Sequence, residues 1–407
     1  MPADLLPLEE AQARLLELAG PLPLEEVPLA QAAGRWLARD VDARLTHPPA
    51  DTSAMDGWAV RFADLPGPLK VVGMAAAGHP FPGPVAPGQA VRIFTGAPLP
   101  AGADTVAVQE EMAEEGGCVR LMGEGPGAPG ANVRPRGLDV RQGAVVGRAG
   151  ERLTPRHLGL LAAAGLDRVP VRRRPRVVWL ATGDELVPPG VEPGPGRIVS
   201  SNGVMVAAQL AAAGAHVEDR GILPDDREAI AAALAEAARD ADVILTSGGA
   251  SVGEHDLVRP VLGDLGAEIE FWRLAIRPGK PILAGRLGSA VVVGLPGNPV
   301  AAFVGTLLLA APFVRHLAGD PDPWPRPDWW PAAVDLPAGG PRRDFQRARL
   351  ERTDAGWRVR PFPVQDSSML SVLAKSDALL VRPERAPPVR AGEAVPVLRL
   401  DGVVPGG

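Results

Sequence analysis

The fold is decided by one stretch of the chain: Val243-Ile244-Leu245-Thr246-Ser247-Gly248-Gly249-Ala250-Ser251-Val252-Gly253-Glu254-His255-Asp256. Its β-branched and aliphatic start is typical of a buried parallel strand. A loop with three glycines and two serines follows, and Glu254 and Asp256 suit the first turn of a helix. Backbone N–H groups and a helix N-terminus converge in such a loop. The stretch therefore predicts an anion-binding site.

The residues around this stretch alternate between strand and helix patterns. We expect strands over residues 177–180, 215–222, 243–245, 269–274 and 290–293, and helices over 202–213, 226–239, 254–262 and 300–316. Such alternation indicates βαβ units and a mostly parallel sheet. Ligands of these sheets bind at the carboxyl ends of the strands.

Five loops are expected at that edge of the sheet: residues 182–185, 223–226, 247–256, 277–281 and 295–299. They share glycines, hydroxyls, carboxylates and one lysine, Lys280, in a chain that otherwise uses arginine almost throughout. We predict a binding or catalytic site here. Hard carboxylate oxygens that favour Mg²⁺ come from Glu185, Asp225, Asp226 and Asp256. The alternative for Asp226 and Glu254 is helix capping.

Composition indicates a multidomain globular protein. The chain has 407 residues, of which 46% are hydrophobic and 22% charged, so two to four domains are expected. Its net charge of −6 argues against nucleic acid as a partner. The single cysteine, Cys118, excludes an intrachain disulfide and a cysteine metal cluster. The first ten residues carry acids where a signal peptide needs positive charge, and we identify no long apolar span. A cytoplasmic protein without a membrane segment is expected.

The remaining segments are strand-rich or helical. We expect helices over residues 5–18, 29–37 and 153–166, with a strand over 24–27. Short strands predict a β-rich domain from 41 to 136 and a small β domain from 329 to 400. The run from Arg168 to Arg176 is interpreted as a solvated linker. Gly125 to Gly130 matches a dinucleotide motif but lacks a strand and helix around it, so we reject it.

Two other classes of function remain as alternatives. Residues 249–253 match G-x-S-x-G, which would make Ser251 the nucleophile of an α/β-hydrolase. That triad lacks a suitable histidine, because His255 is too close and His316 falls in a helical run. A fluorophosphonate that failed to label Ser251 would remove this alternative. The second alternative is a non-catalytic scaffold, which would not need five polar loops at one edge.

Seven motifs in order give the chain a resemblance to the MoeA family of molybdopterin molybdenumtransferases, to which the gephyrin E domain is related. The residues that carry it are Ser53-Ala54-Met55-Asp56-Gly57-Trp58-Ala59, Thr95 to Asp104, Asn132-Val133-Arg134, Thr182-Gly183-Asp184-Glu185-Leu186, Ser247 to Asp256, Pro278-Gly279-Lys280-Pro281 and Gly294-Leu295-Pro296-Gly297-Asn298-Pro299. They span almost the full length of the chain.

The resemblance implies a multidomain α/β plus β architecture. The expected domains are a discontinuous one at 1–43 and 138–173, an inserted β-rich one at 44–137, an α/β domain at 174–320 that resembles molybdopterin adenylyltransferases, and a small C-terminal β-barrel at 328–407. The implied reaction inserts molybdate into adenylylated molybdopterin and releases AMP with Mg²⁺. A homodimer with an active site shared between subunits is implied, and a molybdopterin adenylyltransferase is a candidate partner. The near alternative is a relative that only adenylylates molybdopterin.

Site roles follow from the same resemblance. Catalytic roles fall to Asp56, Thr95, Glu185, Asp225 and Lys280. Metal binding falls to Asp225, Asp256 and Glu185. Substrate or cofactor binding falls to Ser247, Gly248, Gly249, Ser251, Gly253, Pro296, Asn298, Pro299, Arg347 and Ser368, of which Arg347 and Ser368 are the residues expected to bind molybdate. The chain departs from the family pattern at Trp58, where tyrosine is usual, and at Asp366-Ser367-Ser368.

Overall fold

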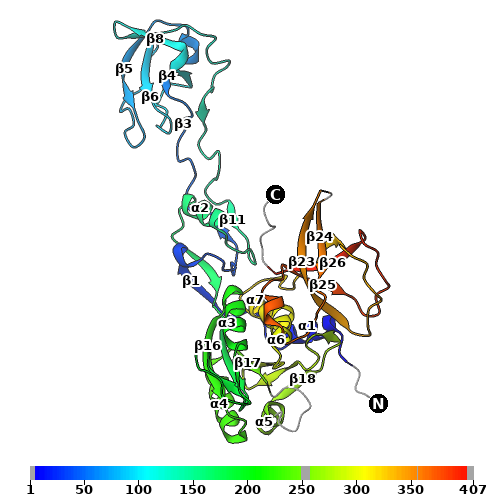
Figure 1. Cartoon of the computed structure of the whole chain (residues 1–407). Coiled ribbons are helices and arrows are strands. Elements are labelled where there is room, and N and C mark those ends of the chain that lie inside the picture. Colours follow the sequence, from blue (N-terminus) through cyan, green and yellow to red (C-terminus); the bar gives the residue numbers. More distant parts are fainter. Residues whose placement is uncertain (1–4, 249–256, 355, 401–407) are drawn as a thin grey trace. The chain divides into compact units, whose positions relative to one another are not determined.

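The computed structural model describes residues 5–248, 257–354 and 356–400 (Figure 1). The chain forms two compact units. Residues Glu26–Val171 make one unit, and the segments on either side, Met1–Glu25 and Arg172–Gly407, make the other. The family resemblance predicts four domains, and their boundaries stay predictions, because this division separates only two units.

The β-rich part of the 26–171 unit is built on a six-stranded sheet. Its order is β7 (Thr105–Val108), β4 (Gly57–Val60), β6 (Gln89–Ile93), β5 (Leu69–Ala75), β9 (Cys118–Leu121) and β8 (Met112–Glu115). Neighbouring residues of a strand face opposite sides, so Trp58 joins the core on one face and Ala59 the core on the other. A short pair of strands, β3 (Thr52–Ser53) and β10 (Val133–Arg134), lies beside the sheet.

The rest of this unit packs around one helix, α2 (Pro155–Ala163). Two strand pairs accompany it: β1 (Leu24–Pro28) with β12 (Arg168–Arg172), and β2 (Val41–Asp42) with β11 (Val145–Gly147). Leu37, Leu161 and Val169 meet in its core. The predicted helix over 29–37 is wrong beyond a 3-10 turn at Leu29–Gln31.

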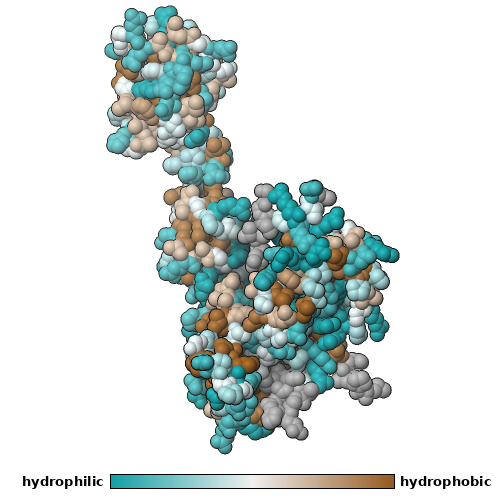
Figure 2. Space-filling model, viewed as in Figure 1, coloured by the Kyte–Doolittle hydropathy of each residue, from teal (hydrophilic) through white to brown (hydrophobic). Residues whose placement is uncertain are grey.

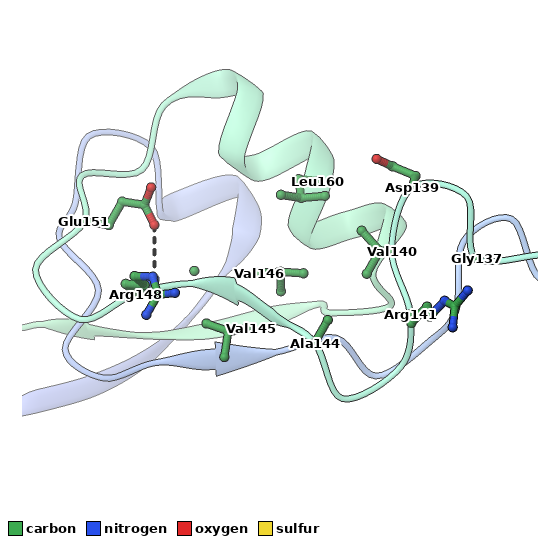
Figure 3. A pocket seen from close by; sticks show the side chains of 11 residues that line it. Gly137, Asp139, Val140, Arg141, Ala144, Val145, Val146, Arg148, Glu151 and Leu160 are labelled. Atoms are coloured by element: carbon green, nitrogen blue, oxygen red, sulfur yellow. Dashed lines mark hydrogen bonds between the residues drawn. The ribbon is translucent and has the colours of Figure 1, made fainter.

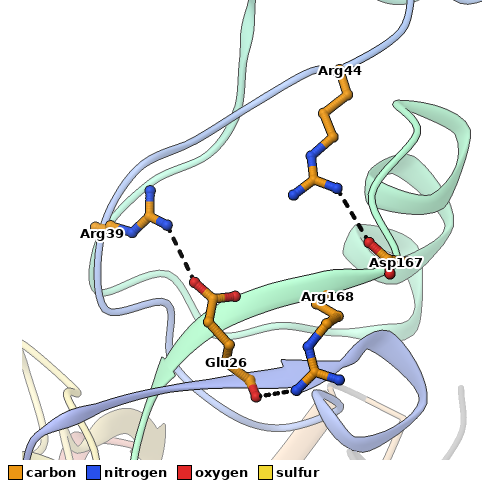
Figure 4. A network of polar contacts seen from close by, with 5 residues as sticks. All are labelled: Glu26, Arg39, Arg44, Asp167 and Arg168. Atoms are coloured by element: carbon orange, nitrogen blue, oxygen red, sulfur yellow. Dashed lines mark hydrogen bonds and ion pairs between the residues drawn. The ribbon is translucent and has the colours of Figure 1, made fainter.

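The arginine run was also predicted wrongly as a linker. Its first half forms β12, with Val169 and Val171 fully buried. Arg168 donates to the Glu26 carbonyl at 2.6 Å, and the Glu26 side chain pairs with Arg39 (Figure 4). In the same network Arg44 pairs with Asp167. Exposed pairs of this kind contribute little to stability, so the buried valines account for the strand.

The α/β domain contains a second six-stranded sheet. Its order is β16 (His216–Leu223), β13 (Arg176–Thr182), β17 (Val243–Ser247), β21 (Ala290–Leu295), β20 (Leu283–Leu287) and β18 (Glu268–Trp272). The first four strands are parallel, whereas β20 is antiparallel to both of its neighbours. The prediction of a mostly parallel sheet at this position is confirmed, and β20 is an additional strand.

Helices cover both faces of this sheet. One face packs against α1 (Leu8–Glu17), α3 (Asn202–Ala212), α6 (Pro299–Gly305) and α7 (Ala311–Leu317). The other face packs against α4 (Arg227–Asp240) and α5 (Val258–Asp264). Every residue of β17 and β21 is therefore buried. Burial on both faces explains why such strands appear in the sequence as nearly continuous apolar runs.

Helices α6 and α7 are joined by a π-helical segment, Thr306–Ala310. The whole run, Pro299–Leu317, is long and apolar enough to cross a membrane by length and composition. The sequence predicted a helix here but no long apolar span. However, 72% of its most apolar window is buried within the protein. This burial identifies the run as the core helix of the α/β domain.

The C-terminal domain is a small closed barrel. Its strands run β24 (Gly356–Pro361), β23 (Arg343–Thr353), β25 (Ala378–Arg382), β26 (Ala394–Arg399) and β22 (Asp328–Pro331). A bridge from Ala332 to Val359 joins the first strand to the last. A short helix, α8 (Leu370–Leu373), precedes β25. Leu379, Val381 and Leu398 pack into the α/β core, and β19 (Ile276–Arg277) pairs with β23.

Candidate active site

The sheet topology brings the five polar loops to one edge. Strands β13, β16, β17 and β21 run parallel, so the loops that follow them leave from the same side. Strand β18 is antiparallel to β20, which is antiparallel to β21. Its carboxyl end, and with it the loop at 277–281, therefore lies at that side too.

Two carboxylates face each other at this edge. The Asp225 N–H donates to Asp184 Oδ1 at 3.1 Å, and the Asp184 N–H donates to Asp225 Oδ2 at 3.4 Å. The loops after β13 and β16 are thereby joined, and each carboxylate keeps a second oxygen. Asp226 is different, because its Oδ1 accepts from the Ala229 N–H and caps α4. Capping is thus the role the structure assigns to Asp226.

Glu185 and Lys280 are further charged groups of this edge. A Cβ placed on Gly183 would lie 2.4 Å from Glu185 Oε2, so glycine is what allows this carboxylate to fold back over the loop. Lys280 has an exposed side chain, and its carbonyl accepts from the Leu274 N–H at 2.8 Å. The backbone of Lys280 is held while its ammonium group faces solvent.

The start of the glycine loop is fixed by its neighbours. Ser247 is buried at the end of β17, and its hydroxyl donates to the Pro296 carbonyl at 3.3 Å. Gly248 has φ +90°, and a Cβ there would lie 2.6 Å from the Thr182 carbonyl oxygen. Glycine is therefore required where β17 passes close to β13. Gly249, Ser251, Gly253 and Asp256 lie outside the described residues.

The loop at 296–299 leads into the core helix. Asn298 is the N-cap residue of α6 and Pro299 its first residue, a position that suits proline. The Val300 N–H donates to the Ser367 carbonyl at 3.0 Å. The barrel loop that contains Ser368 is thus attached to the start of α6.

Arg347 holds that barrel loop from inside. Its side chain is only 1% exposed. Its guanidinium donates to Gln365 Oε1 at 3.2 Å and to the Asp366 carbonyl at 2.6 Å. Burial lowers the pKa of Arg347, while the charges of Asp366 and Asp344 act in the opposite direction. The geometry shows an anchoring contact, and molybdate binding by Arg347 remains a prediction.

Ser368 is turned toward an acid. Its N–H and hydroxyl donate to Asp366 Oδ1 at 2.8 and 2.6 Å. The side-chain bond from Ser368, followed by the backbone bond from the same residue, lowers the pKa of Asp366. Binding of an oxyanion by Ser368 would therefore require its hydroxyl to leave this carboxylate.

In the 26–171 unit, Asp56 and Thr95 form a tight pair. The Thr95 N–H and hydroxyl both donate to Asp56 Oδ1 at 2.8 Å. The backbone bond, then the side-chain bond, lowers the pKa of Asp56 despite some desolvation, and the Arg92 charge adds to the effect. The two residues were predicted to share a role, and they share one hydrogen-bonded motif.

Arg92 supports this pair and was missed by the sequence reading. Its guanidinium lies 4.6 Å from the Trp58 ring centroid and 4.8 Å from that of Phe94. It also donates to the Gly57 carbonyl at 3.0 Å. Tryptophan is the strongest partner for such stacking, which gives the departure at Trp58 a physical meaning.

The described carboxylates suit Mg²⁺ only in part. No group of three or more His, Cys, Asp or Glu side chains able to hold a metal occurs within residues 5–248, 257–354 and 356–400. Mg²⁺ usually takes one or two carboxylates together with substrate phosphates and water. The free oxygens of Asp184 and Asp225 fit that requirement, with Glu185 one residue away. Asp184 was not among the predicted ligands.

A separate pocket of about 640 Å³ opens in the 26–171 unit (Figure 3). Asp139, Arg141, Arg148 and Glu151 line it together with Val140 and Leu160. Within it the Arg148 N–H donates to Glu151 Oε2 at 3.1 Å. None of the predicted site residues lies in this pocket, and its charges of both signs do not indicate one ligand class.

Two histidine positions bear on the hydrolase alternative. His255 lies outside the described residues. His316 is in α7, stacked on Phe313 with ring centroids 6.3 Å apart. Desolvation lowers the pKa of His316, opposed by a hydrogen bond with the Ala19 backbone. His316 is half-buried in the last turn of α7, so it lies in a helix and not in a loop that follows a strand.

Family comparisons match three regions of the chain. Residues 6–165 match the MoeA N-terminal region (domain I and II), 178–316 a probable molybdopterin binding domain, and 330–400 the MoeA C-terminal region (domain IV). The molybdopterin molybdenumtransferase of Haemophilus influenzae is 38% identical over 97% of this chain and 98% of its own. Molybdopterin molybdenumtransferase 2 of Mycobacterium tuberculosis is 38% identical over 91% and 94%.

Solved structures agree with these relatives. Two crystal structures of the MoeA protein from Pyrococcus horikoshii superpose with TM-scores of 0.83 and 0.82, at 31% and 30% identity. They cover 98% and 97% of this chain and all of their own. Together with the loops gathered at one edge of the α/β sheet, these matches show that the chain belongs to the MoeA family and is a molybdopterin molybdenumtransferase of molybdenum cofactor biosynthesis.

Proposed function

We propose that this enzyme takes adenylylated molybdopterin and molybdate and releases molybdenum cofactor and AMP in a Mg²⁺-dependent reaction. The observation that carries the proposal is the edge of the α/β sheet. There, the Asp184–Asp225 pair, the exposed Lys280 and the start of the glycine loop leave from one side of the sheet. Opposite charges arranged in this way suit a phosphoanhydride together with a divalent cation.

Each group has a distinct task in this proposal. Gly248, at the start of the glycine loop, would present its backbone N–H to the phosphates. Lys280 neutralises phosphate charge as a mobile point charge. Asp184 and Asp225, with Glu185, would hold Mg²⁺. When bound, the metal would polarise the phosphoanhydride and stabilise charge on the departing AMP.

Asp56 and Thr95 are proposed to act across a homodimer, each pair serving the site of the partner subunit. Their mutual bonds keep Asp56 ionised, so it can accept a hydrogen bond or position the metal. Support for self-association comes from exposed apolar residues near α3. Figure 2 shows hydrophobic surface there. Val204 of α3 is exposed, as are Ile198 and Val199 shortly before the helix. A molybdopterin adenylyltransferase remains a candidate partner, and a cytoplasmic location is proposed.

The test mixes the purified enzyme with adenylylated molybdopterin, Mg²⁺ and molybdate and follows AMP. We expect AMP release to require molybdate and to stop when Mg²⁺ is chelated. Asp225→Asn should lower the rate by about 10²-fold or more, in line with the loss of a metal-positioning group. AMP release that does not depend on molybdate would contradict insertion and favour adenylyl chemistry alone.

A further inference from the structure

Asn202 connects two loops of the site through one side-chain amide. It is the first residue of α3 and is 9% exposed. Its Nδ2 donates to Ser247 Oγ at 2.8 Å and to the Gly297 carbonyl at 2.8 Å. An amide nitrogen carries two hydrogens, so both donors of Asn202 are used.

The bonds continue beyond Asn202. Ser247 accepts from Asn202 and donates onward to the Pro296 carbonyl at 3.3 Å. Asn202 and Ser247 together therefore fix two successive carbonyls, those of Pro296 and Gly297. The end of β17, the start of α3 and the loop before α6 are held as one hydrogen-bonded cluster. Buried polar clusters are rigid when fully satisfied.

This cluster determines where two ligand-facing segments begin. Gly248 follows Ser247 directly and is already confined by Thr182. Asn298 follows Gly297 directly and occupies the N-cap position of α6. If the amide of Asn202 were lost, the Gly297 carbonyl and the Ser247 hydroxyl oxygen would each lose a donor, and only the bond from Ser247 to the Pro296 carbonyl would remain.

We propose that Asn202 is a positioning residue for substrate binding, which sets the Ser247–Gly248 and Pro296–Asn298 segments in the arrangement that receives the phosphates of the adenylylated pterin. This inference rests on the proposed function. It assigns Ser247 a role through the placement of Gly248, because the Ser247 hydroxyl is committed inside the protein. Both side-chain donors of Asn202 bind protein oxygen atoms, so its proposed effect on the substrate is indirect.

Three variants test this role. Asn202→Ala removes both donors. Asn202→Asp keeps the size but places an ionised carboxylate opposite two acceptors, and protonation returns one donor. The control is Gln209→Ala on the same helix, because Gln209 also donates an amide N–H to a carbonyl, that of Phe303 on α6 at 3.4 Å. Gln209 lies outside both ligand-facing segments.

The measurements are kcat and KM for molybdate-dependent AMP release, the affinity for AMP with Mg²⁺ by calorimetry, and Tm. We expect Asn202→Ala to raise KM and weaken AMP binding by about 10- to 100-fold, as for a buried hydrogen-bond partner that is removed. Gln209→Ala should change both by less than about twofold, whatever its Tm. In Asn202→Asp, kcat/KM relative to wild type should rise as the pH falls, because a buried carboxyl is protonated more readily.

The inference is overturned if Asn202→Ala changes Tm as Gln209→Ala does but leaves KM and AMP affinity unaltered. Should Asn202→Ala fail to fold, a flat pH profile of Asn202→Asp relative to wild type would overturn it instead. A wild-type enzyme that binds AMP without molybdate-dependent turnover would remove the proposed reaction, while the comparison of AMP affinities still decides the role of Asn202. No AMP binding by the wild type would overturn both.

Discussion

At the scale of single residues, chemistry depends on how polar groups are paired. Asp56 is paired with Thr95, Asp184 with Asp225, and Ser368 with Asp366. The first two pairs join residues that are far apart in the sequence, and the third joins two residues of one turn. The pairs decide which oxygen atoms stay free for a ligand, and the Asp56–Thr95 pair can be examined by a single substitution.

Thr95→Val removes the hydroxyl donor to Asp56 and keeps the backbone donor. Since the hydrogen bonds from Thr95 hold the pKa of Asp56 below its ordinary value, we expect this pKa to rise in the variant. The wild-type pair contributes stability above the ordinary pKa of about 3.9, and this contribution is lost as the pH falls through the lowered pKa. Carbon NMR titration of the Asp56 carboxyl measures the shift. Thr95→Ser is the control, and identical titrations of the two variants would contradict the assignment.

Gly248→Ala should be costly because the new Cβ would meet the Thr182 carbonyl oxygen at 2.6 Å, at φ +90°. Gly288 is a matched control with φ +60°, where an added Cβ would have no atom within 4 Å. We expect Gly248→Ala to lose about 1–3 kcal/mol more in urea unfolding than Gly288→Ala. It should also lower AMP affinity. Equal losses of unfolding free energy in the two variants would show that the contact between Gly248 and the Thr182 carbonyl does not restrict the side chain.

At the scale of elements, the α/β sheet is secured where its strands begin. Asp242 precedes β17, and both of its oxygens accept from Arg173, at 2.7 and 3.0 Å. Asp242 Oδ2 also accepts from the Arg176 N–H at 2.7 Å, so the first residue of β13 is tied to the start of β17. The hydrogen bond with Asp242 raises the pKa of Arg173.

Arg173→Met breaks this junction. The side chains of the pair are only 32% and 18% exposed, so we expect a loss of about 1–3 kcal/mol in the free energy of unfolding. The exposed pair Arg326–Asp322, at 79% and 54%, is the control. Arg326→Met should cost less than about 1 kcal/mol. Similar costs for the two variants in urea titrations would show that the junction adds no more than a surface pair.

At the scale of the whole molecule, the chain divides into two units with separate cores. Residues 26–171 have buried clusters of their own around Leu161, Trp58 and Val91. The α/β domain and the barrel share a core through Phe345 and Leu379. A unit with its own core can fold independently.

We therefore expect a fragment of residues 26–171 to fold alone. The measurement is a dispersed NMR spectrum with a cooperative thermal transition. Calorimetry of the intact chain should show at least two transitions, one of which matches that of the fragment. A fragment without cooperative unfolding would contradict the independence of the two units. Trp58→Ala, which empties a core position, should abolish the transition of the fragment.

Sequence patterns alone determined several local elements of the α/β domain and the order of the polar loops. Strand and helix periodicity placed β13, β17, β21 and the core helix near their true bounds. The topology of alternating strands then predicted that the loops share an edge. These inferences succeed because side-chain periodicity and turn residues act over a few positions along the chain.

Tertiary structure alone decided the rest. Within residues 29–37, Trp36 and Leu37 form bridges with Arg152 and Val171 instead of continuing a helix. Strand β20 contains Gly285, where a Cβ would lie 2.4 Å from the Glu268 carbonyl oxygen of β18, so the glycine that weakens the strand pattern is required by the neighbouring strand. The bonds of Asn202 reach 45 and 95 positions along the chain. No local pattern encodes such partners, because the hydrogen bonds form only after the sheet has brought the strand ends together. The start of the glycine loop at Ser247 and Gly248 was thus predicted from the sequence, whereas the Asn202 amide that holds Ser247 was visible only in the fold.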